Sequence, residues 1–312
     1  MKPQETAIEL RKVRDIGEVL GTTFAFLRIH FLDMARLALV LAGPVYLIGV
    51  IVTVSTTFNN PGNTPEDVVM TVLGQGGFWG TLLVILSSII FGITVFIYMG
   101  AYTAGTLESL STGALIRQTL RGIARAVGLY LPFGLFMALF LFPLMIVPVA
   151  GVLAVFGLVV YGAVILTMGY AALIIENRGI GESVRRAVDL LKGLWWQTFG
   201  LLVTLAIQTY LFMIVILIPL VVTLALTSAN TPEGTLPFEN IGWVAALASF
   251  LYFSVAAIMQ MVFNIAIGVQ YFNLSERKEM TGLLNKLEAI EVRIEEPLSD
   301  PPTAETEPGS GV

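Results

Sequence analysis

The feature that most constrains this chain is the stretch from Val127 to Ile175, which holds 49 residues without a charged side chain. As one straight helix it would be about 70 Å long at 1.5 Å per residue. The hydrocarbon core of a bilayer is about 30 Å thick, so the stretch predicts two transmembrane helices joined by a turn. Helix-breaking residues mark the expected turn at Pro143, Pro148 and Gly151.

Further apolar runs of similar length lie on both sides of this stretch. Only 12% of all residues are charged, and the mean hydropathy is +0.85. Soluble domains carry about 25% charged residues, so a water-soluble α/β protein is the weaker alternative. We therefore predict an all-α integral membrane protein with six transmembrane helices. The expected spans are residues 37–56, 78–104, 127–147, 152–175, 198–227 and 241–272.

Small residues and a proline indicate how the first two spans are shaped. Gly76 and Gly80 lie four residues apart, as do Gly100 and Ala104, a spacing that permits close packing of helices. Pro44 is expected to kink the first span.

A charged, amphipathic stretch precedes each predicted hairpin of spans. Residues 16–36, 108–126 and 180–200 carry apolar side chains at three- and four-residue steps, which is the spacing of one helical face. Their moderate hydrophobicity predicts helices that lie in the membrane interface. The middle stretch also has a basic face, formed by Arg117, Arg121 and Arg125.

The distribution of charge predicts the topology. All 17 Lys and Arg residues fall on one side of the six predicted spans, and the three loops on the other side have none. The positive-inside rule then places both termini in the cytoplasm. The predicted regions are a cytoplasmic N-terminus with an amphipathic helix (1–36), the membrane domain (37–272), a cytoplasmic amphipathic helix (273–294) and a disordered acidic tail (295–312).

An internal repeat is suggested by a shift of 164 residues. It aligns the Ile-Gly-Glu at residues 16–18 with that at 180–182, and Trp79 with Trp243. The sequence Asn-Thr-Pro-Glu occurs at residues 63–66 and again at 230–233. The alternative is that all membrane hairpins look alike. If the repeat is real, the chain consists of three hairpin repeats in parallel orientation around an axis along the membrane normal, although the middle hairpin lacks Ile-Gly-Glu.

Basic and aromatic residues gather where the stretch 180–200 meets the membrane. Basic residues beside an anionic leaflet bind lipid head groups at about 1 kcal/mol each. The alternative is ordinary anchoring, because Lys, Arg and Trp are common at the cytoplasmic interface. The candidate lipid or partner interface consists of Arg185, Arg186, Lys192, Trp195 and Trp196.

Polar side chains inside the predicted spans give a second candidate site. Gln260 and Asn264 share a helical face, and Gln208 lies in the preceding span. These residues either bind a substrate or, more commonly, form hydrogen bonds between helices. Glu18 and Glu182 are expected in the first turn of their helices, where a carboxylate suits the helix dipole, with contact between the repeats as the alternative.

The composition argues against several classes of function. The chain has no cysteine and a single histidine, His30, which we interpret as an interfacial side chain. Nothing combines a nucleophile with a base, so we expect no catalysis, metal or cofactor. The chain has no excess of basic residues, so nucleic acid is not expected as a partner.

The motifs of the stretch 176–200 resemble a known family. Glu176-Asn177, then Gly-Ile-Gly-Glu-Ser-Val-Arg-Arg-Ala at 179–187, Leu-Leu-Lys-Gly-Leu-Trp-Trp at 190–196 and Gly200 are similar to the membrane domain of the glycerophosphoryl diester phosphodiesterase family and its stand-alone bacterial relatives. The start at residues 16–24 and the ending at 271–279 also resemble those proteins. The resemblance implies the membrane architecture and a location in the bacterial cytoplasmic membrane. It argues against the enzymatic activity, because the family's catalytic domain is a separate barrel that needs His and acidic residues.

Three functions remain as hypotheses. The first is a non-catalytic protein whose cytoplasmic interfacial helices contact either lipid, including anionic head groups, or a membrane protein partner. The second is an uncoupled transporter or facilitator of small molecules or lipids, because coupled transport usually needs charged groups inside the spans and none is present. The third is a lipid enzyme that acts at the interface through Glu108, Glu176 or Glu182, each without a partner base.

Overall fold

The computed structural model describes residues 8–59, 75–107, 111–144, 150–229, 238–280 and 287, and in these ranges it contains helices and no strand. The helices are α1 (Ile16–Leu41), α2 (Gly43–Asn59), α4 (Gln75–Thr103), α5 (Thr112–Leu144), α6 (Ala150–Ile175), α7 (Ile180–Leu191), α8 (Trp195–Ala229) and α9 (Phe238–Glu279). Outside the described residues lie both copies of Asn-Thr-Pro-Glu (63–66 and 230–233), Glu108, Pro148 and the acidic tail.

The long apolar helices fit a multi-pass α-helical membrane protein. Five stretches within α4, α5, α6, α8 and α9 are long and apolar enough to cross a bilayer, and α1 with α2 gives a sixth if this bent pair is one span. The stretches are Gly77–Thr103, Gly113–Met137, Leu153–Ile175, Trp195–Val215 and Ser254–Glu279.

The first expected span is broken near its start. α1 continues to Leu41, α2 begins at Gly43, and the two helices meet at an angle of 62°. Pro44 lies in the first turn of α2, where its missing N–H needs no partner and its ring prevents α1 from continuing. The bend predicted for Pro44 therefore separates two helices.

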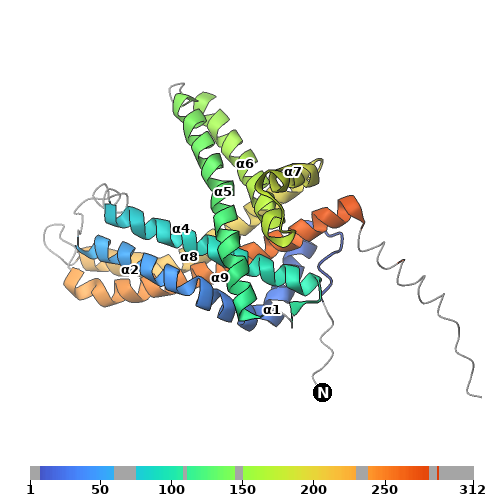
Figure 1. Cartoon of the computed structure of the whole chain (residues 1–312). Helices are drawn as coiled ribbons and strands as arrows, with labels where there is room; N and C mark the ends of the chain where they lie inside the picture. The colour runs from blue at the N-terminus through green and yellow to red at the C-terminus, as the bar shows by residue number, and fades with distance from the viewer. Residues whose placement is uncertain are drawn as a thin grey trace, which may run out of the picture.

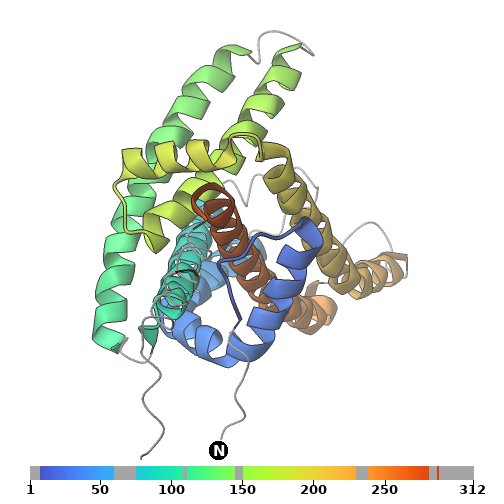
Figure 2. The ribbon, with the colours of Figure 1, turned by 90° about the vertical axis from the view of Figure 1, so that its right-hand side faces the viewer.

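The second half of α9 forms the centre of the molecule. Figure 2 shows its end surrounded by α1, α4, α6, α7 and α8, and it contacts each of them. From Met261 to Glu276 nearly every side chain is buried, including the polar Gln270 and Asn273. α9 runs without a break through residue 272, where the sequence analysis placed the end of the membrane domain.

The hairpin of α5 and α6 crosses the other long helices steeply. In Figure 1 it rises away from α2, α4, α8 and α9, which run in roughly one direction. The crossing is close at Gly122 of α5, where an added β-carbon would lie 2.9 Å from Ile93 of α4. Beyond this point the hairpin exposes large apolar side chains such as Leu139 (72% exposed) and Phe156 (68%). These surfaces require lipid or another apolar environment.

The expected lead-in helices differ from one another. α7 is a separate amphipathic helix, because residues Lys192–Leu194 form a turn between α7 and α8, in which Gly193 adopts a left-handed φ of 79°. The corresponding stretches at the start of α1 and α5 continue into the apolar part of the same helix. At the shift of 164 residues the break after α7 would fall inside α1, so the two proposed repeats do not share this feature. A lead-in helix distinct from the following span is therefore seen for α7 and, up to the bend before α2, for α1, whereas the stretch at the start of α5 belongs to the same helix as its predicted span.

Close packing by small residues is confirmed at one of the two predicted places. Gly80 of α4 lies against α2, and an added β-carbon would be 2.8 Å from the backbone nitrogen of Thr53 and 2.9 Å from the carbonyl oxygen of Gly49. At Gly100 an added β-carbon would meet its nearest atom at 3.9 Å. This nearest atom is the carbonyl oxygen of Ile175 at the end of α6, so Gly100 has room for a β-carbon, and Gly100 and Ala104 both line a cavity.

Candidate functional site

The amphipathic helix α7 lies across the end of α6 (Figure 1). Its buried face contains Ser183, Ala187 and Leu190, and an added β-carbon at Gly169 of α6 would lie 3.8 Å from the Ala187 methyl carbon. Apolar side chains at these steps place the remaining residues of α7 on the surface. Glu182 accepts a hydrogen bond from the Gly179 backbone N–H at 3.4 Å, so it lies in the first turn as predicted.

Glu18 plays the corresponding role at the start of α1. Its carboxylate accepts from the Asp15 backbone N–H at 3.0 Å, and the Asp15 carboxylate accepts from the Glu18 N–H at 2.7 Å. This reciprocal pair is a capping box, which stabilises the beginning of the helix. Both glutamates are therefore used within their own helix start.

Three of the predicted interface residues are exposed. Arg185 lies on the surface of α7, and Trp196 is 76% exposed at the start of α8. The Lys192 ammonium contacts the Asp189 carboxylate at 2.8 Å. The hydrogen bond from Lys192, with the attraction of its charge, lowers the pKa of Asp189. The structure therefore leaves Arg185 and Trp196 available for external contacts and pairs Lys192 locally.

Trp195 is directed inward. Its ring stacks on Phe199 with 5.1 Å between ring centroids and on Tyr161 of α6 with 5.7 Å. Its indole nitrogen is buried and has no hydrogen-bond partner in the described part of the chain. Trp195 therefore joins α8 to α6, and its place in an external interface was predicted wrongly.

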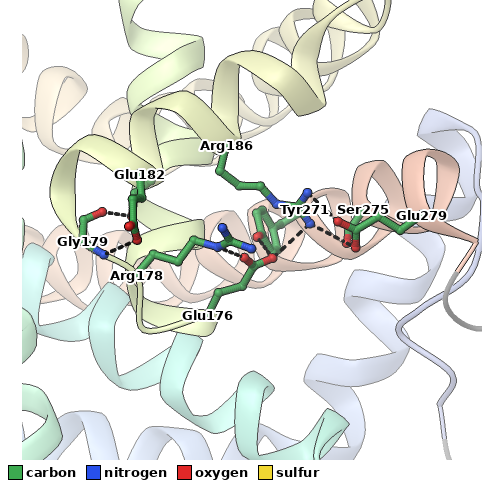
Figure 3. A network of polar contacts seen from close by, with 9 residues as sticks. Glu176, Arg178, Gly179, Glu182, Arg186, Tyr271, Ser275 and Glu279 are labelled. Atoms are coloured by element: carbon green, nitrogen blue, oxygen red, sulfur yellow. Dashed lines mark hydrogen bonds and ion pairs between the residues drawn. The ribbon is translucent and has the colours of Figure 1, made fainter.

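Arg186 is also directed inward, although its neighbour Arg185 is exposed. Figure 3 shows its guanidinium between Glu176, at the end of α6, and Glu279, at the end of α9. The nitrogen–oxygen distances are 3.2 Å to Glu176 and 2.5 Å to Glu279, and the Arg186 side chain is 15% exposed. Successive residues on a helix point about 100° apart, which separates the two arginines. The assignment of Arg186 to an external interface was wrong, because it joins three helices.

Other polar groups complete this network. Glu176 also accepts from Arg178 and from the Tyr271 hydroxyl of α9. Ser275 donates to Glu279 at 3.0 Å and lies 3.3 Å from Arg186. Burial acts to lower the pKa of Arg186, but its hydrogen bond to Glu279 and the charge of Glu176 outweigh burial and raise it. The paired charges stabilise the junction of α6, α7 and α9.

The N-terminal segment is held against α9 by a second polar cluster. The Arg14 backbone N–H donates to the Asn273 side chain at 2.8 Å, and Arg277 donates to the Arg14 carbonyl at 2.7 Å. The Asn273 side chain in turn donates a hydrogen bond to the Gln270 side chain at 3.0 Å. Gln270 donates to the Thr198 hydroxyl of α8, also at 3.0 Å. These buried groups join the N-terminal segment, α8 and α9. The sequence showed only a hint of them, a row of polar residues three or four apart in an apolar helix.

The predicted intramembrane cluster is only partly assembled. Asn264 donates to the Gln260 backbone carbonyl of its own helix at 2.8 Å and lies beside Gly92 of α4. Gln260 lines a cavity of 480 Å³ between α1, α2, α4 and α9, whereas Asn264 and Gln208 do not line it. The cavity wall is mostly apolar, with Ser87, Ser88 and Gln260 among its polar side chains.

The single histidine has a packing role. His30 of α1 lies 2.9 Å from the Tyr98 hydroxyl of α4, and its ring packs against Phe26 and Tyr102. Within the described ranges no three His, Asp or Glu side chains form a group that could hold a metal ion.

Comparisons with protein-family models, curated proteins and solved structures each find no match. The resemblance to the membrane domain of the glycerophosphoryl diester phosphodiesterase family therefore stays a prediction that rests on the sequence motifs.

Proposed function

We propose that this chain is a non-catalytic, six-span protein of the bacterial cytoplasmic membrane that contacts lipid or a protein partner through its cytoplasmic interfacial helices. The observation that carries the proposal is the junction of α7 and α8. There Arg185 is exposed on α7, and Trp196 is exposed at the start of the apolar stretch of α8, which begins at Trp195. An exposed Trp at the start of an apolar stretch, with an exposed Arg on the preceding helix, suits the head-group layer of an anionic leaflet.

The lipid contact is tested by the lipids that remain on the purified chain. The full chain and the variant Arg185→Ala/Trp196→Ala are extracted in mild uncharged detergent, and bound phosphatidylglycerol and phosphatidylethanolamine are measured by mass spectrometry. We expect the variant to retain several-fold less phosphatidylglycerol relative to phosphatidylethanolamine. Arg28→Ala, which removes an exposed arginine of α1, is the matched control. An unchanged ratio of phosphatidylglycerol to phosphatidylethanolamine in the variant contradicts the lipid contact and favours a protein partner.

The topology is tested separately. Because the chain has no cysteine, single-cysteine variants can be labelled without background. In spheroplasts, an impermeant maleimide is expected to label Asn63→Cys, and to label Gly181→Cys only after the membrane is opened. Gly181 is exposed with nothing within 4 Å of an added β-carbon, so α7 tolerates the change. The reverse labelling pattern would contradict the cytoplasmic placement of α7.

The cavity at Gln260 favours a facilitator of lipid movement as a second candidate. Its volume of 480 Å³ and mostly apolar wall are suited to part of an acyl chain. The test is the rate at which a fluorescent phospholipid exchanges between leaflets of proteoliposomes. We expect the chain to accelerate this exchange. Ala257 lines the cavity, so Ala257→Trp should fill part of the cavity and abolish the acceleration. A rate equal to that of protein-free vesicles excludes this candidate.

A further inference from the structure

A second cavity lies between the ends of α4 and α6 and the first half of α5. Its volume is 310 Å³. The floor is apolar and is formed by residues such as Phe96, Ile97 and Ile174. The rim is polar and contains Thr106, Gln118, Arg121, Arg125 and Asn177. None of the lining residues is acidic, so the rim carries two positive charges.

The arginines reach this cavity because of their spacing on α5. Gln118, Arg121 and Arg125 follow one another at three and four residues, beside the buried stripe that contains Thr119 and Gly122. Arg117 belongs to the same basic face in the sequence, but it does not line the cavity. Arg117 and Arg121 are both exposed, but of these two only Arg121 lines the cavity, so Arg117 is its matched control.

Hydrogen bonds hold the rim in place. Arg125 donates to the Asn177 side chain at 2.6 Å, and Asn177 has a left-handed φ of 54°, a conformation that asparagine tolerates. The carbonyls of Gly100 and Ala101 accept from the amides of Ala104 and Thr106 at 3.0 and 2.9 Å. These carbonyls at the end of α4 are therefore satisfied without the arginines.

The guanidinium groups keep donors for a ligand. No ion pair involves Arg121 or Arg125 in the part of the chain that the structure describes. Each guanidinium has five N–H donors in a planar fork that matches phosphate oxygens, and Arg125 uses few of them within the protein. An apolar floor below such donors also fits the carbon chain attached to a phosphate.

We propose that this cavity binds the phosphate group of a phosphate ester, with Arg121 and Arg125 as its ligands, and that the ester is an anionic phospholipid of the cytoplasmic leaflet. Basic pockets between membrane helices on the cytoplasmic side are suited to such head groups. The choice of a lipid over a soluble ester rests on the proposed membrane function and on the apolar floor. The volume accommodates a head group and the first carbons of its chains.

The test measures binding to the full chain in uncharged detergent. Phosphatidylglycerol, glycerol 3-phosphate and inorganic phosphate are titrated separately, and bound ligand is measured by native mass spectrometry. We expect phosphatidylglycerol to bind and Arg121→Ala to weaken binding about tenfold, because charge-assisted contacts to phosphate are strong. The matched control Arg117→Ala should change the dissociation constant less than twofold. Equal weakening by Arg117→Ala and Arg121→Ala would show non-specific attraction and overturn the proposal.

A second variant tests the cavity without removing charge. Ala104→Phe places a ring at the exposed rim and keeps both arginines, and we expect it to weaken phosphatidylglycerol binding at least fivefold. Unchanged binding by this variant would exclude the cavity. Tighter binding of glycerol 3-phosphate than of phosphatidylglycerol would overturn the lipid assignment.

The same titration separates this proposal from the α7–α8 interface. The residues changed in Arg185→Ala/Trp196→Ala lie outside the cavity, so this variant should leave the proposed binding of phosphatidylglycerol in the cavity unchanged. If Arg121→Ala weakens binding while the α7–α8 variant has no effect in either assay, the cavity proposal holds and the proposed α7–α8 contact fails. If only the α7–α8 variant weakens binding, the cavity proposal fails.

Discussion

Replacing Arg186 by alanine should destabilise the junction of α6, α7 and α9 more than any other single charge removal on α7. Among the described residues, the change leaves Glu279 with the hydrogen bond from Ser275, while Glu176 keeps Arg178 and Tyr271. Breaking a fully buried ion pair costs about 3–5 kcal/mol, and an exposed pair is worth about 0.2–1 kcal/mol.

The exposed fractions of the three charged side chains show that the cost of losing Arg186 lies between the values for a buried and for an exposed ion pair. The Arg186 side chain is 15% exposed and Glu176 is 21% exposed, but Glu279 is 41% exposed and is screened by water. We therefore expect Arg186→Ala to lower the free energy of unfolding by about 2–3 kcal/mol. At about 2 °C per kcal/mol for a chain of this size, the midpoint of thermal unfolding in detergent should fall by about 4–6 °C.

The neighbouring arginine is the control for this experiment. Arg185→Ala removes the same charge from the surface of the same helix, and it should stay within about 0.5 kcal/mol of the unmodified chain. In a double-mutant cycle, Glu279→Gln should cost less after Arg186 has been removed, with a coupling of about 1–2 kcal/mol. Equal shifts for both arginine variants, or strict additivity with Glu279→Gln, would refute the role assigned to Arg186.

Three further substitutions test the packing of the helices and the attachment of the N-terminal segment, with thermal unfolding in detergent as the measurement. Gly80→Ala should cost about 1–3 kcal/mol, because its β-carbon would lie 2.8 Å from the Thr53 backbone nitrogen. Gly134→Ala on α5, with nothing within 4 Å, should be neutral or stabilising, and a similar loss there would contradict the packing argument. Asn273→Ala should cost about 2–3 kcal/mol, because it leaves the buried Arg14 N–H without an acceptor. Proteolysis of the N-terminal segment should accelerate in that variant, and unchanged cleavage would argue against its role as a tether.

The sequence allowed the helical class and the apolar stretches to be predicted, because both depend on local composition and length. The starts of α1 and α7 were predictable for the same reason, since Glu18 and Glu182 mark a first turn. The break before α8 was not predictable from hydropathy, because it depends on the left-handed conformation of Gly193.

The polar interior of α9 could not be predicted, because its partners are distant in the sequence. Hydropathy assigns Asn273 and Glu279 to the surface after a span. Asn273 instead meets Arg14, 259 positions away, and Glu279 meets Arg186. A buried polar side chain is stable only when its partner is present, and a single sequence does not show which residues will be partners.

The same reasoning explains why the count of basic residues predicts an orientation and still leaves the role of each one undetermined. Arg185 and Arg186 are adjacent, yet one is exposed and the other lies between two carboxylates. On α5, Arg121 and Arg125 line a cavity that has no acidic lining residue. An arginine that already contacts carboxylates has little affinity left for an external anion, whereas one in a cavity without acids keeps its donors. The position of acidic partners, more than the density of basic residues, is therefore what led us to propose Arg121 and Arg125, and not Arg186, as ligands of an anion.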